Sequence, residues 1–271
     1  MKTRVISAAV LVPILLLIVL VAPISAAATI LGILLAIAAY ELLYRTGLVK
    51  QPRLVIYSSV MAFIISMWSY FEAVRAYFVL LLMAFFMLML AEMMMGHIKV
   101  RFETVSMCFA GGVMIPYFLT ALIRILTMNI GRYVILIPFI VAFMNDAGAY
   151  FVGVRFGKHK LAPVVSPNKT IEGVFGGLAG AMIGMLLYAL ILDFPLKFEV
   201  NYLLALLYGL LGSAVGTFGD LCFSIIKRQT GIKDYGNLIP GHGGVLDRFD
   251  SLSMVAPLME ALLLLLPLVE M

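Results

Sequence analysis

Four carboxylates stand where long apolar stretches of the chain give way to polar residues. Asp146 and Asp220 come late in hydrophobic runs, and Asp247 and Asp250 follow at a loop-to-helix junction. A carboxylate beside lipid is costly unless it is paired or bound to a cation. Mg²⁺ commonly takes one or two carboxylates together with substrate phosphates. We therefore expect Asp220 and Asp247, with Asp146 as a third ligand, to bind Mg²⁺, and a second cation is left open. The alternative is internal ion pairing, for which the candidate partners are Arg155, Lys227 and Arg248.

Basic side chains and glycines accompany these acids. Lys227 lies seven residues after Asp220, two helical turns on and on the same face of a helix. Glycines at 241, 243 and 244 allow backbone N–H groups to approach phosphate oxygens closely. The combination favours a phosphorylated ligand, although a basic surface could also meet anionic lipid headgroups. The candidate cations for phosphate are Lys169, Lys227, Arg228, Lys233 and Arg248.

Two further polar features belong to the same chemistry. His242 stands between glycines, so it could bind phosphate, coordinate a metal or donate a proton, or it could be an ordinary surface or core histidine. The segment "SPNKT", residues 166–170, combines a turn signal with the start of a helix. A helix N-terminus favours an anion. Capping by Thr170 explains most of this segment but leaves Lys169 unexplained.

The elements that carry these residues are apolar helices. The chain is 64% hydrophobic and 12% charged, and runs of about 20 apolar residues, the length that spans a bilayer, recur almost end to end. Only helices or closed barrels satisfy their backbone groups in lipid, and these runs lack the alternation of barrel strands. We predict an all-α polytopic membrane protein with about nine spans. The expected spans are 5–22, 24–43, 54–71, 76–95, 105–125, 133–152, 171–192, 202–226 and 251–269.

The placement of charge predicts the orientation. With nine spans, the N-terminus and every second loop share one side of the membrane. Of the 19 Lys and Arg residues, all but Arg75, Arg124, Arg132 and Lys197 fall on that side. The positive-inside rule therefore places the N-terminus in the cytoplasm and the C-terminus outside. The basic, apolar start resembles a secretory signal, but its run is long and another follows at once, so we expect a retained first helix.

Polar residues are distributed unevenly along this single predicted membrane domain, residues 1–271. Residues 1–130 form a helical scaffold, in which Glu41 and Glu92 are exceptional intramembrane acids, either functional or paired with a nearby Arg or Lys. Residues 131–271 carry the polar motifs, all at cytoplasmic ends of spans, and are the expected catalytic half. Glycines at 176, 180 and 184 have the spacing of close helix packing. Those at 209, 212, 216 and 219 lead to Asp220 and serve either packing or a ligand.

Several classes of function are excluded by what the sequence lacks. It has no GxxxxGK[ST] loop, no GxGxxG after a strand and no nucleic-acid-binding pattern of basic and aromatic residues. The two cysteines, Cys108 and Cys222, have no zinc-site or disulfide spacing and are expected to be buried free thiols.

The segment "SIIKRQTGIKDYGNLIPGHGGVLDRFD", residues 224–250, resembles the C-terminal signature of phosphatidate cytidylyltransferases, also called CDP-diacylglycerol synthases. It matches this signature without departure at Ser224, Lys227, Arg228, Lys233, Asp234, Pro240, His242, Gly243, Gly244, Asp247, Arg248 and Asp250. Segments "DAGAYFVGVRFGKHK" and "SPNKTIEG" are also similar, although Ala147 stands where a Thr is expected. The resemblance covers residues 145–251.

The resemblance implies a reaction and a set of roles. CTP and phosphatidic acid would give CDP-diacylglycerol and pyrophosphate, with Mg²⁺, in phospholipid biosynthesis at the cytoplasmic side of the cell membrane. The lipid phosphate is already anionic, so positioning and charge neutralisation suffice. The expected catalytic residues are Lys227, Arg228, His242 and Arg248. Substrate would be bound by Lys169, Ser224, Lys233, Gly243 and Gly244, and the metal by Asp220, Asp247 and Asp146.

Two alternatives are weighed against this reading. A cation-coupled transporter or channel using intramembrane aspartates would spread polar residues through the midplane and show paired halves with broken helices. A CDP-alcohol phosphotransferase would carry several aspartates along a helix after an Asp-Gly, and that pattern is missing. The glycine-rich helices permit a homodimer but do not require one.

Overall fold

The computed structural model describes residues 2–95 and 100–270; Lys99, one of the basic loop residues counted above, lies outside them. The chain divides into two compact units. Unit 1 contains residues 1–128 and 229–249, and unit 2 contains residues 129–228 and 250–271. Residues 229–249, which sequence reasoning assigned to the second half, therefore group with the first.

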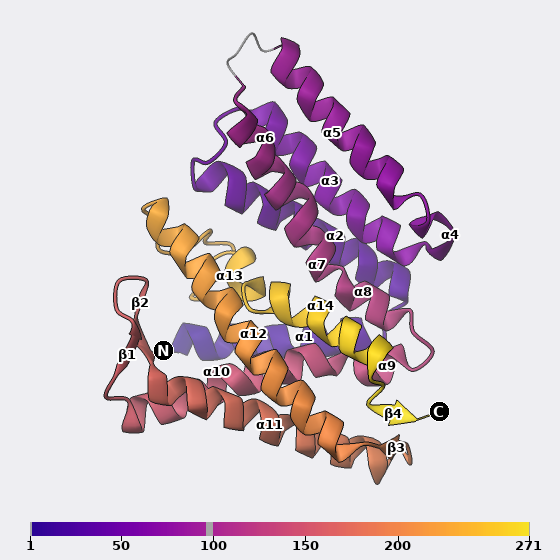
Figure 1. The fold of residues 1–271 in the computed structure, drawn as a ribbon, viewed down its shortest axis with the longest axis vertical. Helices are drawn as coiled ribbons and strands as arrows, with labels where there is room; N and C mark the ends of the chain where they lie inside the picture. The colour runs from indigo at the N-terminus through magenta and orange to yellow at the C-terminus, as the bar shows by residue number, and fades with distance from the viewer. Residues whose placement is uncertain (1, 96–99, 271) are drawn as a thin grey trace. The chain divides into compact units, whose positions relative to one another are not determined.

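The described part of unit 1 is built mainly of helices (Figure 1). Ser66 Oγ donates to the Ala28 carbonyl oxygen at 2.7 Å, which joins two long helices, α2 and α3. Gly32 lies at the same contact, where a Cβ would be 2.8 Å from the Phe63 ring. The helices of this unit are α1 (Lys2–Leu20), α2 (Ile24–Tyr40), α3 (Pro52–Tyr70), α4 (Glu72–Arg75), α5 (Phe78–Met95), α6 (Phe102–Phe109), α7 (Ile115–Leu119), α8 (Ala121–Leu126) and α13 (Leu246–Phe249).

Unit 1 contains two π-helical turns, each continuous with an α-helix. The first, η1 (Glu41–Arg45), continues α2, and the second, η2 (Ala110–Met114), joins α6 to α7. A π-turn adds a residue to one helical turn and is frequent at functional sites. Gly112 in η2 lies against the backbone of Ser58, and a Cβ there would be 2.9 Å from the Ser58 carbonyl oxygen. Leu43 in η1 is fully buried in the core of the unit.

Unit 2 is built on the close packing of α10 against α11. A Cβ on Gly148 would collide with the carbonyl oxygen of Gly176, and one on Gly180 would be 2.5 Å from that of Met144. The predicted packing role of the glycines at 176, 180 and 184 is confirmed. The helices are α9 (Gly131–Val134), α10 (Leu136–Phe156), α11 (Ile171–Asp193), α12 (Tyr202–Gln229) and α14 (Leu252–Leu265). Short strands pair antiparallel as β1 (Lys160–Ala162) with β2 (Ser166–Thr170) and β3 (Glu199–Val200) with β4 (Val269–Glu270).

The glycine spacing of α12 also serves packing, which decides between the two readings of that pattern. A Cβ on Gly216 would be 2.9 Å from Val255 of α14, and one on Gly219 would be 3.2 Å from the Asp250 carbonyl oxygen. Gly212 faces Val141 of α10. These side chains occupy the space that a ligand would need.

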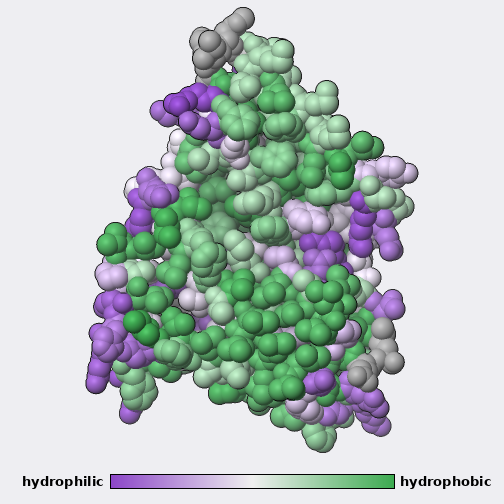
Figure 2. Space-filling model, viewed as in Figure 1, coloured by the Kyte–Doolittle hydropathy of each residue, from purple (hydrophilic) through white to green (hydrophobic). Residues whose placement is uncertain are grey.

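Seven helices within the described residues are long and apolar enough to cross a membrane. They lie at 24–45, 52–70, 78–95, 102–126, 131–156, 171–193 and 202–229, each within a few residues of an expected span. Large apolar side chains are widely exposed, such as Met87 of α5 at 65% and Leu203 of α12 at 75%, and hydrophobic residues cover much of the visible face (Figure 2). This fits a polytopic membrane protein. Helices α1 and α14 match the other two expected spans in position, while the count of nine and the orientation stay predictions.

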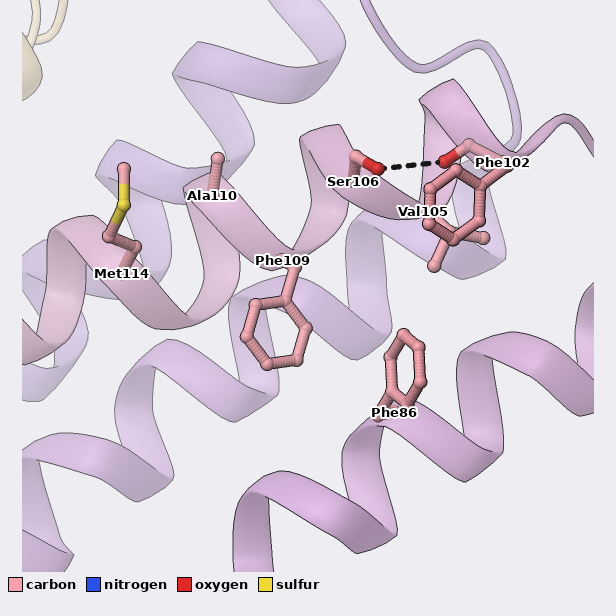
Figure 3. A pocket seen from close by; sticks show the side chains of 7 residues that line it. All are labelled: Phe86, Phe102, Val105, Ser106, Phe109, Ala110 and Met114. Carbon is pink, nitrogen blue, oxygen red and sulfur yellow. Dashed lines mark hydrogen bonds between the residues drawn. The ribbon is translucent and has the colours of Figure 1, made fainter. Parts of the chain in front are cut away.

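A cavity of about 310 Å³ lies in unit 1 between α5 and the helix formed by α6 and η2. Its lining is apolar except for Ser106, whose hydroxyl donates to the Phe102 carbonyl oxygen at 3.1 Å (Figure 3). None of the predicted site residues lines this cavity. The polar chemistry therefore has to be found at the ends of the helices.

Candidate functional site

In unit 2, hairpin β1–β2 brings Lys169 to Asp220 of α12. Lys169 Nζ forms an ion pair with Asp220 Oδ2, and both side chains are about a quarter exposed, at 26% and 27%. One turn later on α12, Ser224 Oγ donates to Asp220 Oδ1 at 3.3 Å. Segment 166–170 is a strand rather than a turn, which explains how Lys169 reaches across to α12. Thr170 ends the strand and caps α11, since its Oγ1 accepts from Gly173 N at 3.1 Å.

The next turn of α12 carries a second pair. Lys227 Nζ lies 4.0 Å from Asp250 Oδ2, and both side chains are largely buried. Burial raises the pKa of Asp250 above that of an ordinary aspartate. The negative charges of Asp220 and Asp146 act in the same direction, whereas Lys227 lowers this pKa. Asp220 and Asp146 therefore both act on the Asp250 carboxyl group.

Arg228 and Asp146 complete the predicted residues of unit 2. Arg228 Nε donates to the Val165 carbonyl oxygen at 3.1 Å and so holds the turn of hairpin β1–β2 against α12. Asp146 is an exposed residue of α10. The hairpin itself is secured at its start, because Glu172 accepts from the backbone N–H groups of Lys158 and His159 and its Oε1 lies 2.6 Å from His159 Nδ1.

In unit 1, Asp247 organises a loop formed by residues 235–247, hereafter the glycine loop. Asp247 is 5% exposed, and its Oδ2 accepts from Tyr235 N at 2.8 Å and from Gly244 N at 2.9 Å. Gly241 and Gly243 adopt φ of +76° and +87°, a conformation that favours glycine. A Cβ on Gly243 would also be 2.8 Å from Asp247 Oδ2. The loop is thus folded tightly around this carboxylate.

The remaining predicted residues of unit 1 surround the loop. His242 is half-buried, and its Nδ1 is enclosed without a hydrogen-bond partner among the residues described. Such a nitrogen is a candidate to bind a substrate oxygen. Lys233 and Arg248 are exposed. Ser7 of α1 donates from Oγ to the Pro240 carbonyl oxygen at 2.9 Å.

Of the two intramembrane acids, Glu92 follows the pairing alternative, whereas sequence reasoning missed how Glu41 is used. Glu92 forms an ion pair with Arg53 at 2.9 Å, which is the pairing alternative considered for both acids. Glu41 instead accepts from the backbone: its Oε2 lies 2.9 Å from Leu246 N, at the end of the glycine loop. An acid in an otherwise apolar span was the available signal, but its partner lies 205 residues away in the chain.

The predicted metal ligands are divided between the units, with Asp146 and Asp220 in unit 2 and Asp247 in unit 1. Across residues 2–95 and 100–270, no three His, Cys, Asp or Glu side chains are grouped so that they could hold a metal ion by themselves. Mg²⁺ fits such a donor set, because it needs only one or two carboxylates when substrate phosphates and water supply the other ligands. Asp220 offers carboxylate oxygens, which Mg²⁺ prefers as ligands, and its side chain is about a quarter exposed.

Comparison with known proteins identifies the family of this chain. The sequence profile of the cytidylyltransferase family matches residues 2–266. The chain is similar to proteins named phosphatidate cytidylyltransferase from Staphylococcus haemolyticus and Staphylococcus epidermidis, each 44% identical over 138 residues, and from Staphylococcus aureus, 43% identical over 138 residues. Each alignment covers 51% of this chain and 52% of the relative, so the chain spans about half the length of the curated relatives it matches.

Proposed function

We propose that this chain, which belongs to the cytidylyltransferase family, transfers CMP from CTP to phosphatidic acid. The products are CDP-diacylglycerol and pyrophosphate, which places the reaction in phospholipid biosynthesis. The observation that carries the proposal is the pair of Lys169 with Asp220, followed along α12 by Lys227 with Asp250. Cations and carboxylates concentrated at one end of apolar helices suit a reaction between a water-soluble nucleotide and a lipid phosphate.

The reaction forms one bond and breaks one. An oxygen of the lipid phosphate attacks the α-phosphorus of CTP, and the bond from that phosphorus to the bridging oxygen of pyrophosphate breaks. No proton has to be removed from the nucleophile, because the lipid phosphate is already anionic at neutral pH. Binding, orientation and charge neutralisation therefore provide the catalysis.

Basic side chains neutralise the charge of the phosphates in this scheme. Lys169 and Lys227 bind phosphate oxygens in unit 2, while Arg248 and Lys233 do so in unit 1. Arg228, which holds the hairpin turn, is a further proposed cation for a phosphate. Ser224, one turn after Asp220, supplies a neutral hydroxyl.

The glycine loop provides the remaining contacts. Gly243 is half-buried and has no side chain to prevent phosphate oxygens from approaching the backbone. Gly244, also predicted to bind substrate, is buried, and its N–H already donates to Asp247 Oδ2, so it shapes the loop instead. His242 assists the departing pyrophosphate through its enclosed Nδ1. Asp220 and Asp146 of unit 2 and Asp247 of unit 1 are the proposed ligands for Mg²⁺, which would supply charge stabilisation to the phosphates. Three carboxylates are enough to contribute to the binding of a second cation as well.

The membrane topology is part of the proposal. Nine spans, with α1 and α14 added to the seven longer helices, give a cytoplasmic N-terminus, an outside C-terminus and an active site on the cytoplasmic side of the cell membrane. A homodimer is compatible with the fold. The transporter alternative is not favoured, since the polar residues follow a nucleotide-dependent family pattern.

The test is an assay of the purified full-length protein in detergent micelles that contain phosphatidic acid. We expect Mg²⁺-dependent formation of CDP-diacylglycerol and pyrophosphate in equal amounts from CTP, and no turnover after EDTA treatment. A folded protein that forms neither product refutes the proposal. Cation flux in liposomes without CTP turnover would support a transporter instead.

A further inference from the structure

Glu41 is a buried carboxylate that the proposed reaction does not use. It begins η1 at the end of the span that continues α2, and it is 3% exposed. Burial of a carboxylate is costly unless it accepts hydrogen bonds or is paired. Glu41 Oε2 accepts from Leu246 N at 2.9 Å, and α2 also packs against α13, in which Leu246 is the first residue. The acid of the first half of the chain is therefore directed at the glycine loop.

The loop is shaped to receive this side chain. A Cβ on Gly244 would lie 2.5 Å from both Glu41 carboxylate oxygens, and the three nearest atoms to it all belong to Glu41. A Cβ on Gly236 would collide with Glu41 Oε1. Neither glycine has a positive φ, so the backbone conformation there is open to other residues. The space taken by the Glu41 carboxylate is what requires glycine.

A second residue of the same π-turn contacts the loop. Arg45 Nη1 donates to Asn237 Oδ1 at 3.0 Å. Glu41 and Arg45 are the first and last residues of η1, so this turn contacts the loop at two points. Asp247 holds the loop from within through Tyr235 N and Gly244 N. Gly244 is thus fixed by Asp247 on its N–H and confined by Glu41 on its Cα.

We propose that Glu41 is a positioning residue that, by holding Gly244 and Leu246, sets the backbone of the neighbouring Gly243 for the phosphates of the nucleotide. This inference rests on the proposed function, because it assigns the glycine loop to the nucleotide. Glu41 touches neither substrate. Without the Glu41 carboxylate, Gly244 and Leu246 can move within the glycine loop. Binding of the nucleotide therefore weakens, whereas binding of the lipid does not change.

The experiment compares Glu41→Ala and Glu41→Gln with the wild type by steady-state kinetics in both substrates. We expect the KM for CTP to rise about 10- to 100-fold in Glu41→Ala, the range for a lost hydrogen bond to a charged group. Glu41→Gln keeps the shape and one acceptor oxygen, so its KM for CTP rises less, by roughly 3- to 10-fold. The KM for phosphatidic acid stays at the wild-type value in both variants.

Glu92→Gln is the matched control, because it makes the same substitution at a buried acid of unit 1 whose partner is Arg53 rather than the loop. It is expected to leave the KM for CTP unchanged. Positioning is refuted if Glu41→Gln has the wild-type KM for CTP, if kcat alone falls in the Glu41 variants, or if Glu92→Gln raises the KM for CTP equally. A purely structural role would reduce the active fraction and hence kcat only.

Hydrogen exchange separates this inference from the proposed function. Backbone amides of residues 235–247 should exchange faster in Glu41→Gln than in the wild type, and at the wild-type rate in Glu92→Gln. This readout requires no turnover. Unchanged exchange refutes positioning of the loop by Glu41 and leaves the proposed function standing. A wild-type protein that does not use CTP refutes the proposed function, and with it the assignment of the loop to the nucleotide, even if exchange changes as expected.

Discussion

Two different substitutions of Asp247 can separate the two roles that this one side chain is expected to have. Asp247 is expected to bind a metal ion, yet its Oδ2 also accepts from Tyr235 N and Gly244 N inside the glycine loop. Asp247→Ala removes both roles at once, so a loss of activity in that variant identifies neither. Asp247→Asn removes the charge and keeps an oxygen that can accept from the same two N–H groups.

The expected magnitudes follow from the burial of these groups. Asp247 is 5% exposed, so its removal leaves two buried N–H groups without an acceptor. At about 1–3 kcal/mol for each group, Asp247→Ala should destabilise the loop by about 2–6 kcal/mol. Asp247→Asn retains both bonds with a neutral acceptor and should cost about 1 kcal/mol. A metal contributes several kcal/mol of charge stabilisation, so kcat/KM of Asp247→Asn should fall by about 100-fold or more.

The assay combines unfolding in detergent with CTP turnover over a range of Mg²⁺ concentrations. The metal assignment is wrong if Asp247→Asn unfolds like the wild type and also turns over CTP at the wild-type rate. The inference that Asp247 stabilises the glycine loop is wrong if Asp247→Ala unfolds at the same denaturant concentration as the wild type. Each variant thus tests one role.

Three other outcomes test the site and the fold. Lys169→Met should raise the KM for CTP by about 10-fold, whereas the same substitution at the exposed Lys160 of the same hairpin should not; equal effects would contradict a specific role for Lys169. Gly180→Ala should lower the stability of unit 2 by about 1–2 kcal/mol in denaturant unfolding, because overpacking against the Met144 carbonyl outweighs the gain in helix propensity. A more stable variant would contradict the close approach of α10 and α11. Removal of Mg²⁺ with EDTA should abolish turnover, and added Mg²⁺, but not K⁺ alone, should restore it; turnover that persists in EDTA would exclude the metal.

The positions of the helices could be predicted from the sequence because the bilayer imposes a simple rule. A span needs about 20 apolar residues, so helices such as Pro52–Tyr70 and Ile171–Asp193 lie within a few residues of the expected ranges. The π-turn Glu41–Arg45 could not be predicted, because its residues, ELLYR, are equally compatible with an ordinary α-helical end and only tertiary contacts select the wider turn.

The site was predictable in its residue types but not in its pairings. Lys227 was expected on the face of Asp220, and both lie on α12, yet Asp220 pairs with Lys169 and Lys227 lies near Asp250. The choice depends on hairpin β1–β2, and β2 was expected to be a turn before a helix. The spacing of Asp220 and Lys227 along one helix can be read from the local sequence. The pairing of Asp220 with Lys169 depends instead on β2, a strand of five residues that contains a proline and is hard to predict.

The contact between Glu41 and Leu246 has a consequence for the order in which the protein is made. The ribosome adds 205 residues after Glu41 before Leu246 exists, which takes roughly 10–40 s at typical synthesis rates. During that time α10, α11 and α12 of unit 2 are synthesised, while unit 1 lacks residues 229–249. Unit 1, whose synthesis begins first, is therefore completed only after most of unit 2 has been translated. A nascent chain stalled before residue 246 therefore carries a Glu41 carboxylate that lacks the Leu246 N–H from which it accepts in the finished protein.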